Sequence, residues 1–158
     1  MSSYEIVKLG ETGNREYLNQ IRERFNANIR DGLYRHVPRG EIPEEELERW
    51  EEELKAGKTV AYVAVDGKDV VAWATLHIDD RCGLGEITVC RDLRLNYKGV
   101  GTELVRKLKE EAKETGLPLL IRTHVENRPM QKIAEKLDFD LYTCVPGEWP
   151  HYEYVAKP

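Results

Sequence analysis

Cysteines and long apolar runs are scarce in this chain of 158 residues. Its three cysteines, Cys82, Cys90 and Cys144, form no Cys-x-x-Cys pair, which argues against a disulfide framework and against a zinc site of that type. The longest apolar stretches, residues 60–65 and 70–78, are shorter than the roughly 20 residues that span a bilayer. The first residues also lack the basic and apolar segments of a secretory signal. We therefore expect a cytoplasmic protein with reduced thiols, no membrane segment and no bound metal.

A surplus of basic residues is missing as well. The sequence has 29 acidic and 24 basic residues, a formal net charge of −5 at pH 7, which argues against binding to a polyanion such as DNA. Hydrophobic residues make up 41%, and the length matches one domain of ordinary size. The sequence thus predicts a single domain over residues 1–158 that binds no nucleic acid and holds anions only at a local site.

What the sequence does contain is a series of short strand and helix patterns. Alternating apolar and polar residues favour strands, and apolar residues at three- and four-residue spacing favour helices. Asp66-Gly67-Lys68 is typical of a hairpin turn, and Asn14 fits a helix N-cap. The expected strands are residues 3–8, 59–65, 69–78, 85–90, 119–124, 139–144 and 152–156, and the expected helices are residues 14–28, 43–57, 99–115 and 129–137. This order predicts an α/β fold in which helices flank a mixed sheet.

The segment most indicative of chemistry is Asn96-Tyr97-Lys98-Gly99-Val100-Gly101-Thr102, between a strand and the longest helix. Two glycines let a backbone approach a ligand, and the free N–H groups of a helix start bind phosphate. The nearby Lys98 and Arg94 add positive charge. The alternative is that the glycines only shape a turn. Neither a Walker motif nor a dinucleotide fingerprint is present, because Leu104 stands where the latter needs its third glycine.

This segment resembles the central motif of the GNAT N-acetyltransferase family, in which Gln or Arg is followed by two residues, Gly, one residue, and Gly or Ala. Asn96 stands at the Gln or Arg position, and both glycines match. A second similarity is Asn127, which opens a short helix leading to Leu137-Asp138-Phe139, like the family's Asn, helix and Gly-Phe. The resemblance extends from about residue 4 to residue 156. It implies a mostly antiparallel sheet of about seven strands with four helices.

The resemblance also implies that acetyl-CoA is the acyl-donor cosubstrate. By position, the backbone of Val89, Cys90 and Arg91 would pair with the pantetheine arm, with an N–H of Val89 or Cys90 as oxyanion donor. The side chain of Asn127 would contact the cofactor. The amides expected to hold the pyrophosphate are those of Tyr97, Lys98, Gly99, Val100, Gly101 and Thr102. A strand edge and a helix N-terminus are suited to an extended amide chain that ends in phosphates.

The chain departs from the family at the usual proton donor. The family tyrosine that protonates the departing thiolate falls at Ala134 here. Tyr142 and Tyr152 are candidate substitutes, because they lie in the C-terminal strands that flank this cleft in the family; packing is the alternative role for each. The resemblance implies transfer of an acetyl group directly to a primary amine of a small molecule or peptide. The alternative is an acyl-CoA-binding regulatory or interaction module with little turnover.

A base is needed because a free amine is mostly protonated at neutral pH. Glu86 is the first candidate, since it lies on the strand beside the cofactor and on the face opposite Ile87; a solvent-facing or ion-paired glutamate is the alternative. His77 and His124 are further candidates that could equally be structural. Cys90 is expected to be a small buried thiol rather than a nucleophile.

Two groups of residues are expected near the acceptor amine, whose identity the sequence does not reveal. They are the basic group Arg30, Arg35, His36 and Arg39 in the loop between the first two helices, and the aromatic group Trp149, His151 and Tyr152. The alternatives are a solvated loop and ordinary packing. Pairing of the C-terminal strands between subunits would give a homodimer.

Overall fold

The described residues of the chain form seven strands and four helices, which confirms the predicted fold class. The structure is a computed structural model that describes residues 3–10 and 15–158. The elements are β1 (Glu5–Lys8), α1 (Arg15–Arg30), α2 (Glu46–Lys55), β2 (Thr59–Asp66), β3 (Asp69–Asp79), β4 (Leu84–Arg91), α3 (Val100–Lys113), β5 (Leu119–His124), α4 (Arg128–Lys136), β6 (Asp140–Val145) and β7 (His151–Ala156). No helix in the described part of the chain has the length and apolar character needed to cross a membrane.

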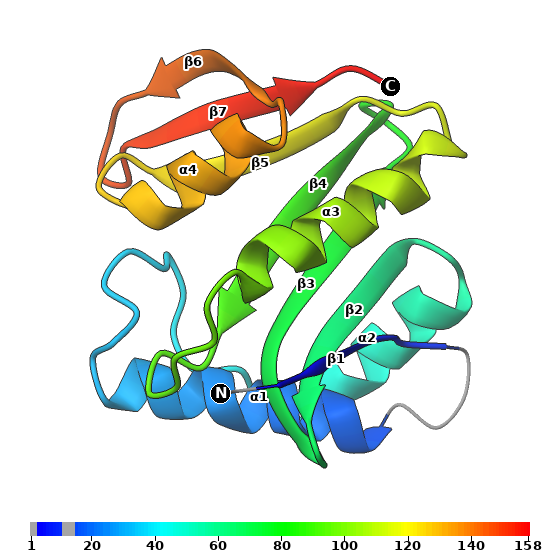
Figure 1. The fold of residues 1–158 in the computed structure, drawn as a ribbon, viewed down its shortest axis with the longest axis vertical. Coiled ribbons are helices and arrows are strands. Elements are labelled where there is room, and N and C mark those ends of the chain that lie inside the picture. The colour runs from blue at the N-terminus through cyan, green and yellow to red at the C-terminus, as the bar shows by residue number, and fades with distance from the viewer. Residues whose placement is uncertain (1–2, 11–14) are drawn as a thin grey trace.

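The strands form one sheet in the order β1-β2-β3-β4-β5-β7-β6 (Figure 1). Every neighbouring pair is antiparallel except β4 and β5, which run parallel. The Asp66-to-Asp69 hairpin joins β2 and β3 as the Asp-Gly turn predicts. β4 and β5 lie side by side only at one end, and β5, β7 and β6 then lead away from β4 with α4 on top of them (Figure 1).

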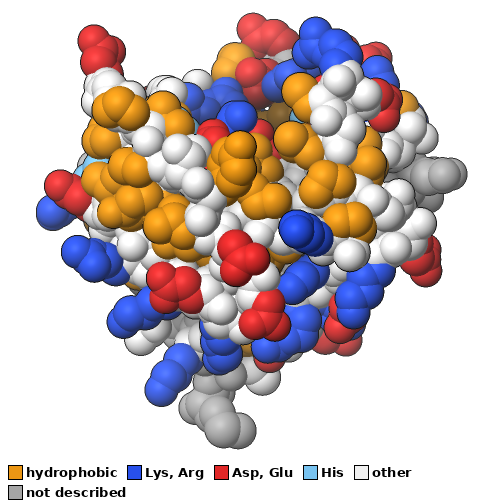
Figure 2. All heavy atoms as spheres, turned by 90° about the horizontal axis from the view of Figure 1, so that it is seen from above, with side chains coloured by type: hydrophobic (Ala, Val, Ile, Leu, Met, Phe, Trp, Pro, Cys, Tyr) orange, Lys and Arg blue, Asp and Glu red, His pale blue; other side chains and the backbone are white. Residues whose placement is uncertain are grey.

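The outer edge of the sheet at β6 is exposed. Leu141 is 56% and Tyr142 is 75% exposed, the largest values among the exposed large hydrophobic residues of the described chain. The register between β6 and β7 shifts between Leu141 and Thr143, so β6 carries an irregularity at Tyr142. Figure 2 looks down on this end of the molecule and shows apolar side chains gathered across it.

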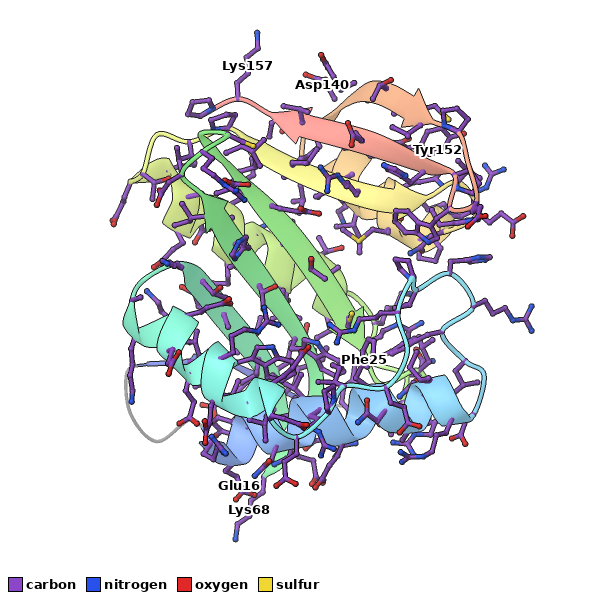
Figure 3. All side chains as sticks on the ribbon, turned by 180° about the vertical axis from the view of Figure 1, so that it is seen from behind. Glu16, Phe25, Lys68, Asp140, Tyr152 and Lys157 are labelled. Carbon is purple, nitrogen blue, oxygen red and sulfur yellow. The ribbon has the colours of Figure 1, made fainter. Side chains whose placement is uncertain are left out.

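Helices cover both faces of the sheet, but unequally. α3 packs on β2, β3 and β4, and α4 packs on α3 and β5. On the opposite face α1 packs on β3 and α2 on β2, so that the face of β5 and β7 seen from behind carries no helix (Figure 3). The side chains of β3 alternate accordingly, with Ala72, Ala74 and Leu76 in the core under α3 and Trp73 in the core under α1 and α2.

Element boundaries differ from the prediction by a few residues. α1 continues to Arg30, and its expected N-cap Asn14 lies outside the described residues. α2 starts at Glu46 rather than Pro43, because Pro43 to Glu45 form a turn whose carbonyl at Pro43 accepts from the N–H of Glu46 at 3.2 Å. α3 starts at Val100, with Gly99 as its N-cap.

Candidate functional site

The most distinctive feature of the sheet is the separation of β4 from β5. Their pairing is limited to Gly85 with Leu119 and Glu86 with Leu120. Beyond these two pairs, Ile87–Arg91 and Ile121–His124 have no partner strand between them in the described chain, and we call this region the β4–β5 splay. It leaves two strand edges unpaired in the middle of a sheet, where backbone groups otherwise find partners.

The backbone of β4 directs its odd-numbered residues toward the splay. The N–H of Gly85 donates to Pro118 at 3.0 Å on the β5 side, whereas the N–H of Asp92 donates to Val71 at 3.0 Å on the β3 side. Because N–H and C=O directions alternate along a strand, Ile87 and Val89 direct theirs into the splay. The backbone of Cys90 faces β3, so of the two expected oxyanion donors only Val89 has its N–H in the splay.

The end of the β4 edge is already occupied. The Tyr34 hydroxyl, from the loop joining α1 and α2 (residues 31–45), donates a hydrogen bond to the carbonyl of Arg91. Burial and the nearby Cys90 and Asp92 raise the pKa of Tyr34, which keeps its hydroxyl protonated as a donor. Burial likewise raises the pKa of the Cys90 thiol to about 12, so this thiol is protonated near neutral pH and is a poor nucleophile.

The start of α3 adjoins the end of β4 through residues 92–99. Gly99 adopts the left-handed conformation with φ of 79°, which glycine accepts without strain, and no side chain caps the helix. A Cβ on Gly101 would lie 3.0 Å from Cδ1 of Ile133, so this glycine also permits close packing of α3 on α4. The N–H groups of the first turn have no acceptor within the helix and carry the positive end of its dipole.

A buried carboxylate holds the connection from β4 to α3. Asp92 is 1% exposed and accepts from Arg94 at 2.8 Å, from Arg24 at 2.9 Å and from Asn28 at 3.3 Å. Burial opposes ionisation, but these hydrogen bonds outweigh it and hold the pKa of Asp92 well below its usual range. The sequence analysis missed this network because its members are up to 68 residues apart. Arg94, expected to aid anion binding, is thus already paired.

Tyr97 adds a second anchor to the same connection. Its hydroxyl donates to Asp66 at 2.6 Å, which raises the pKa of Tyr97, and its ring meets Tyr4 edge to face. The loop before α3 is therefore fixed to the β2–β3 hairpin. Lys98 is exposed beside it.

Asn127 and Ala134 lie on the α4 side of the splay. Asn127 is the N-cap of α4, and its side-chain oxygen accepts from the N–H of Met130 at 3.3 Å. Ala134 is fully buried and offers only a methyl group. The cap role of Asn127 occupies the oxygen of its amide, while its NH₂ group is the part that remains to contact a ligand.

Glu86 lies on the opposite face, where the two strands part. Its carboxylate forms an ion pair with Arg122 at 3.4 Å, and Arg122 also donates to Glu153 at 3.1 Å. His151 lies 3.5 Å from Glu153. His77 stands opposite Glu86 in the β3–β4 register and lies 3.4 Å from the hydroxyl of Thr59. A row of ionisable groups therefore crosses this face from β3 to β7.

The two candidate tyrosines lie at different distances from the splay. Tyr142 lies on β6, two strands away from β5, and is largely exposed. The structure does not bring it to the splay. Tyr152 pairs with Thr123 of β5 and lies at the end of β7 nearest the α1–α2 loop (Figure 3).

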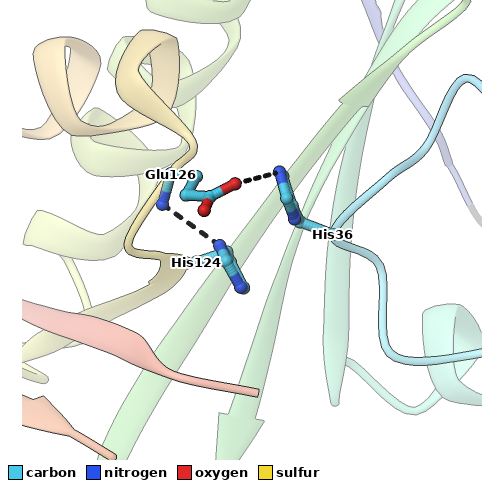
Figure 4. A group of neighbouring side chains, drawn as sticks. All are labelled: His36, His124 and Glu126. Carbon is cyan, nitrogen blue, oxygen red and sulfur yellow. Dashed lines mark hydrogen bonds and ion pairs between the residues drawn. The ribbon is translucent and has the colours of Figure 1, made fainter. Parts of the chain in front are cut away.

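The α1–α2 loop is joined to the far side of the splay by an aromatic and polar contact. His36 stacks on His124 with ring centroids 4.1 Å apart, and its Nε2 lies 3.3 Å from a carboxylate oxygen of Glu126 (Figure 4). Trp149 donates from Nε1 to the carbonyl of His36 at 2.7 Å, and its ring lies 4.8 Å from that of His151. The predicted basic and aromatic groups thus meet at His36 and Trp149.

His36, His124 and Glu126 offer three ligand atoms within 4.8 Å of one another, a group that could hold a metal ion. Here, however, Nδ1 of His124 accepts from the N–H of Glu126 at 3.1 Å, and the stacked rings are nearly parallel at 11°. Nitrogen lone pairs lie in the ring planes, so parallel stacked rings do not point at a shared ion. The three residues therefore form a hydrogen-bonded contact.

Two of the three arginines of the predicted basic group have acidic partners. Arg30 pairs with Glu41 at 2.7 Å, and Arg39 pairs with Glu46 at 3.4 Å. Arg35 is exposed. Most of the positive charge of this loop is balanced within the loop and at the start of α2.

Comparison with known proteins agrees with this geometry. The model of the acetyltransferase (GNAT) family matches residues 21–139. An N-acetyltransferase from Staphylococcus aureus Mu50 shares the fold with a TM-score of 0.79 and 18% identity, covering 97% of this chain and 98% of that one. The yncA protein of Salmonella typhimurium, solved with acetyl-CoA, has a TM-score of 0.79 and 16% identity, and the match covers 96% of this chain and 93% of that one. A ribosomal-protein-alanine N-acetyltransferase from Brucella melitensis has a TM-score of 0.80 and 17% identity, and the match covers 98% of this chain and 99% of that one.

Among the curated proteins, chromogranin-A from Sus scrofa matches over part of its length. The alignment is 29% identical and covers 73% of this chain. The chain spans only 28% of chromogranin-A, and this match assigns no activity.

Proposed function

Because the chain belongs to the acetyltransferase (GNAT) family, we propose that it transfers an acetyl group from acetyl-CoA directly to a primary amine of a small molecule or a peptide. The observation that carries this proposal is the unpaired edge of β4, which ends beside the uncapped start of α3. Together they offer amide-binding groups followed by phosphate-binding groups along one line.

The residues of this line fit the cofactor. Ile87 and Val89 have backbone groups free to pair with the amides of a pantetheine arm. In the first turn of α3 the N–H of Val100 donates to the carbonyl of Tyr97 at 3.4 Å, so within the described chain the N–H groups left for the pyrophosphate are those of Gly101 and Thr102. When bound, acetyl-CoA supplies the activated acyl group. The NH₂ group of Asn127 adds a donor on the opposite side of the splay.

The chain's own groups then provide the remaining chemistry. The N–H of Val89 is the proposed donor to the acyl oxygen as negative charge develops on it. Glu86 is the proposed base for the acceptor amine, because its carboxylate lies where the strands part, 3.4 Å from Arg122. The row formed by Glu86, Arg122 and Glu153 faces away from α3, so the amine approaches from the face opposite the helix that holds the pyrophosphate.

A second candidate function rests on Ala134. This position is fully buried and offers no proton donor, which suits a module that binds acyl-CoA without turnover. The two functions differ in a single-turnover experiment with a competent amine, because a binding module returns the acetyl-CoA unchanged.

The proposed phosphate site is tested with a charge at Thr102. We expect Thr102→Glu to weaken acetyl-CoA binding roughly tenfold or more, because a carboxylate in the first turn repels the pyrophosphate. Isothermal titration calorimetry with acetyl-CoA measures the effect. Glutamate near a helix N-terminus is favourable for the helix, so the loss is not explained by unfolding.

The matched control is Thr102→Gln, because glutamine has the shape of glutamate without its charge. This variant should bind acetyl-CoA with an affinity within about threefold of that of the original protein. Equal affinity of the two variants would contradict the proposed site. Transfer itself is measured with radiolabelled acetyl-CoA across a panel of amines. Binding of acetyl-CoA with no product for any amine would favour the second candidate function.

We also propose that the protein forms a homodimer through β6. Charged residues and proline commonly protect sheet edges from pairing with another chain, and residues 141–145 of this edge strand contain neither. Antiparallel pairing of two copies keeps their Asp140 carboxylates at opposite ends of the shared ladder and covers Leu141 and Tyr142.

A further inference from the structure

Thr123 carries a buried hydroxyl without a partner. The residue is 3% exposed, and its Oγ1 forms no hydrogen bond. In the described part of the chain only one other buried side-chain polar atom, Nε of Arg24, is in this state, and the terminal nitrogens of Arg24 are paired with Asp92 and Asp69. Buried hydroxyls are normally satisfied, so an unpaired one indicates a group that acts on something absent from the free protein.

The position of Thr123 in the sheet shows what it faces. It lies in the part of β5 that has separated from β4. Its side chain is on the same face as Ile121, which packs in the core under α3 and α4, and this face also holds the side chain of Val89. Three residues beyond the last pair, Glu86 with Leu120, the two strands reach Val89 and Thr123. The two residues are therefore at the same level on opposite sides of the splay.

This level is where the proposed function places the reacting carbonyl, because Val89 supplies the N–H that faces the acyl oxygen. The sulfur is bonded to the same carbonyl carbon, so it lies at the level of Thr123. Other candidate donors are less well placed. Ala134 has no polar group, Tyr142 is on the outer strand, and Tyr152 is one strand farther from β4 than Thr123 is.

We propose that Thr123 Oγ1 donates a hydrogen bond to the thioester sulfur of bound acetyl-CoA and to the thiolate that leaves. This inference rests on the proposed function. In the transfer, the amine nitrogen bonds to the acyl carbon, and the C–S bond breaks with its electron pair remaining on sulfur. The nitrogen loses one proton, which passes through solvent water to Glu86, three residues along β4 from Val89. The hydroxyl keeps its own proton and stabilises the negative sulfur, which then takes a proton from solvent.

The test follows the thiol of bound CoA and needs no acceptor amine. The ultraviolet absorbance of the thiolate is titrated against pH for saturating CoA on the original protein, on Thr123→Val and on Thr123→Ser. We expect the pKa of the bound thiol to be about one unit higher with Thr123→Val than with the other two proteins, because valine keeps the shape and removes the donor. With an amine that is turned over, kcat should fall about tenfold or more while KM for acetyl-CoA changes less than threefold.

Thermal unfolding of the free proteins provides a separate measurement. Thr123→Val should melt no lower than the original protein, because it removes an unsatisfied buried hydroxyl. Should it fail to fold, Thr123→Ala replaces it in the titration. Equal thiol pKa values in all folded variants would overturn the role of Thr123 while leaving the proposed function intact. Failure of the original protein to bind CoA would overturn both.

Discussion

Asp92 shows how a single buried charge positions a binding loop. Its carboxylate joins Arg24 and Asn28 of α1 to the segment that leads into α3. A buried charge that loses one partner is costly, whereas a charge with several hydrogen bonds is held in place. The start of α3, and with it the proposed pyrophosphate site, is therefore fixed by residues from a helix on the other face of the sheet.

We expect Asp92→Asn to lower the free energy of unfolding by about 3 kcal/mol at neutral pH, because Arg24 and Arg94 lose their shared anion. The folded pKa of Asp92 lies below its unfolded value, so its contribution is complete above about pH 4 and is lost as the pH falls toward the folded pKa. The difference between the two proteins in urea unfolding should therefore shrink in acid.

Asp69→Asn is the matched control for this measurement. Asp69 also lies near Arg24, at 3.6 Å, but its side chain is 74% exposed, so we expect a change below about 0.5 kcal/mol. A similar loss of unfolding free energy in Asp92→Asn and Asp69→Asn would contradict the role assigned to Asp92. A difference between Asp92→Asn and the original protein that grows in acid would also contradict it.

Sequence patterns locate single residues well where the role belongs to the backbone and poorly where it belongs to a distant contact. Gly99, expected to give the backbone freedom before the helix, adopts a positive φ that glycine accepts without strain. Tyr142 was placed near the site from its strand alone, yet its side chain is on the outer edge. The network of Asp92 and the unpaired hydroxyl of Thr123 had no local signal, because each depends on what the fold brings next to it.

At the scale of elements, the end of α4 keeps a common motif with an unusual residue. The N–H of Phe139 donates to Ala134 at 2.9 Å and the N–H of Asp138 donates to Glu135 at 3.2 Å, the pairing of a Schellman motif. Asp138 is in the left-handed conformation with φ of 64°, the one positive-φ residue besides glycine in the described chain. The glycine that the family has at this position is thus replaced without loss of the turn.

We expect Asp138→Gly to raise the free energy of unfolding by about 0.5–1 kcal/mol, because glycine adopts this conformation without the Cβ penalty. Chemical denaturation measures the change. Asp138→Ala should instead lower stability, since alanine keeps the penalty and lacks the short polar side chain that tolerates it. If the glycine variant is the less stable of the two, the strain is not located at this residue.

Element order and type follow from the sequence because each pattern is local: hairpin turns, helical spacing and glycine ends. The start of α2 was misplaced by three residues because proline followed by acidic residues suits a turn as well as a first helical turn. The separation of β4 from β5 has no pattern within either strand, and only the family resemblance implied that a cofactor lies beside β4.

At the scale of the whole molecule, the exposed β6 edge bears on whether the protein is a monomer or a homodimer. If the proposed homodimer forms, the double variant Leu141→Lys with Tyr142→Lys should reduce the mass measured by light scattering from twice 18.3 kDa to 18.3 kDa. Charged residues on an edge prevent strand pairing with another chain.

Leu33→Lys serves as the control, because Leu33 is 37% exposed but lies in the α1–α2 loop. It should leave the mass unchanged. A single-copy mass for the original protein at micromolar concentration would rule out a stable homodimer through β6.

The strand order has a consequence for how the molecule assembles during synthesis. β7 follows β6 along the chain but is inserted between β5 and β6. β6 therefore leaves the ribosome before its only neighbour exists, and β5 has a free flank until the same moment. The contact between residues 36 and 149 is also made late, since 113 positions separate them. The half containing β1 to β4 can gain local order early, whereas the half containing β5, β6 and β7 becomes complete only when β7 is inserted.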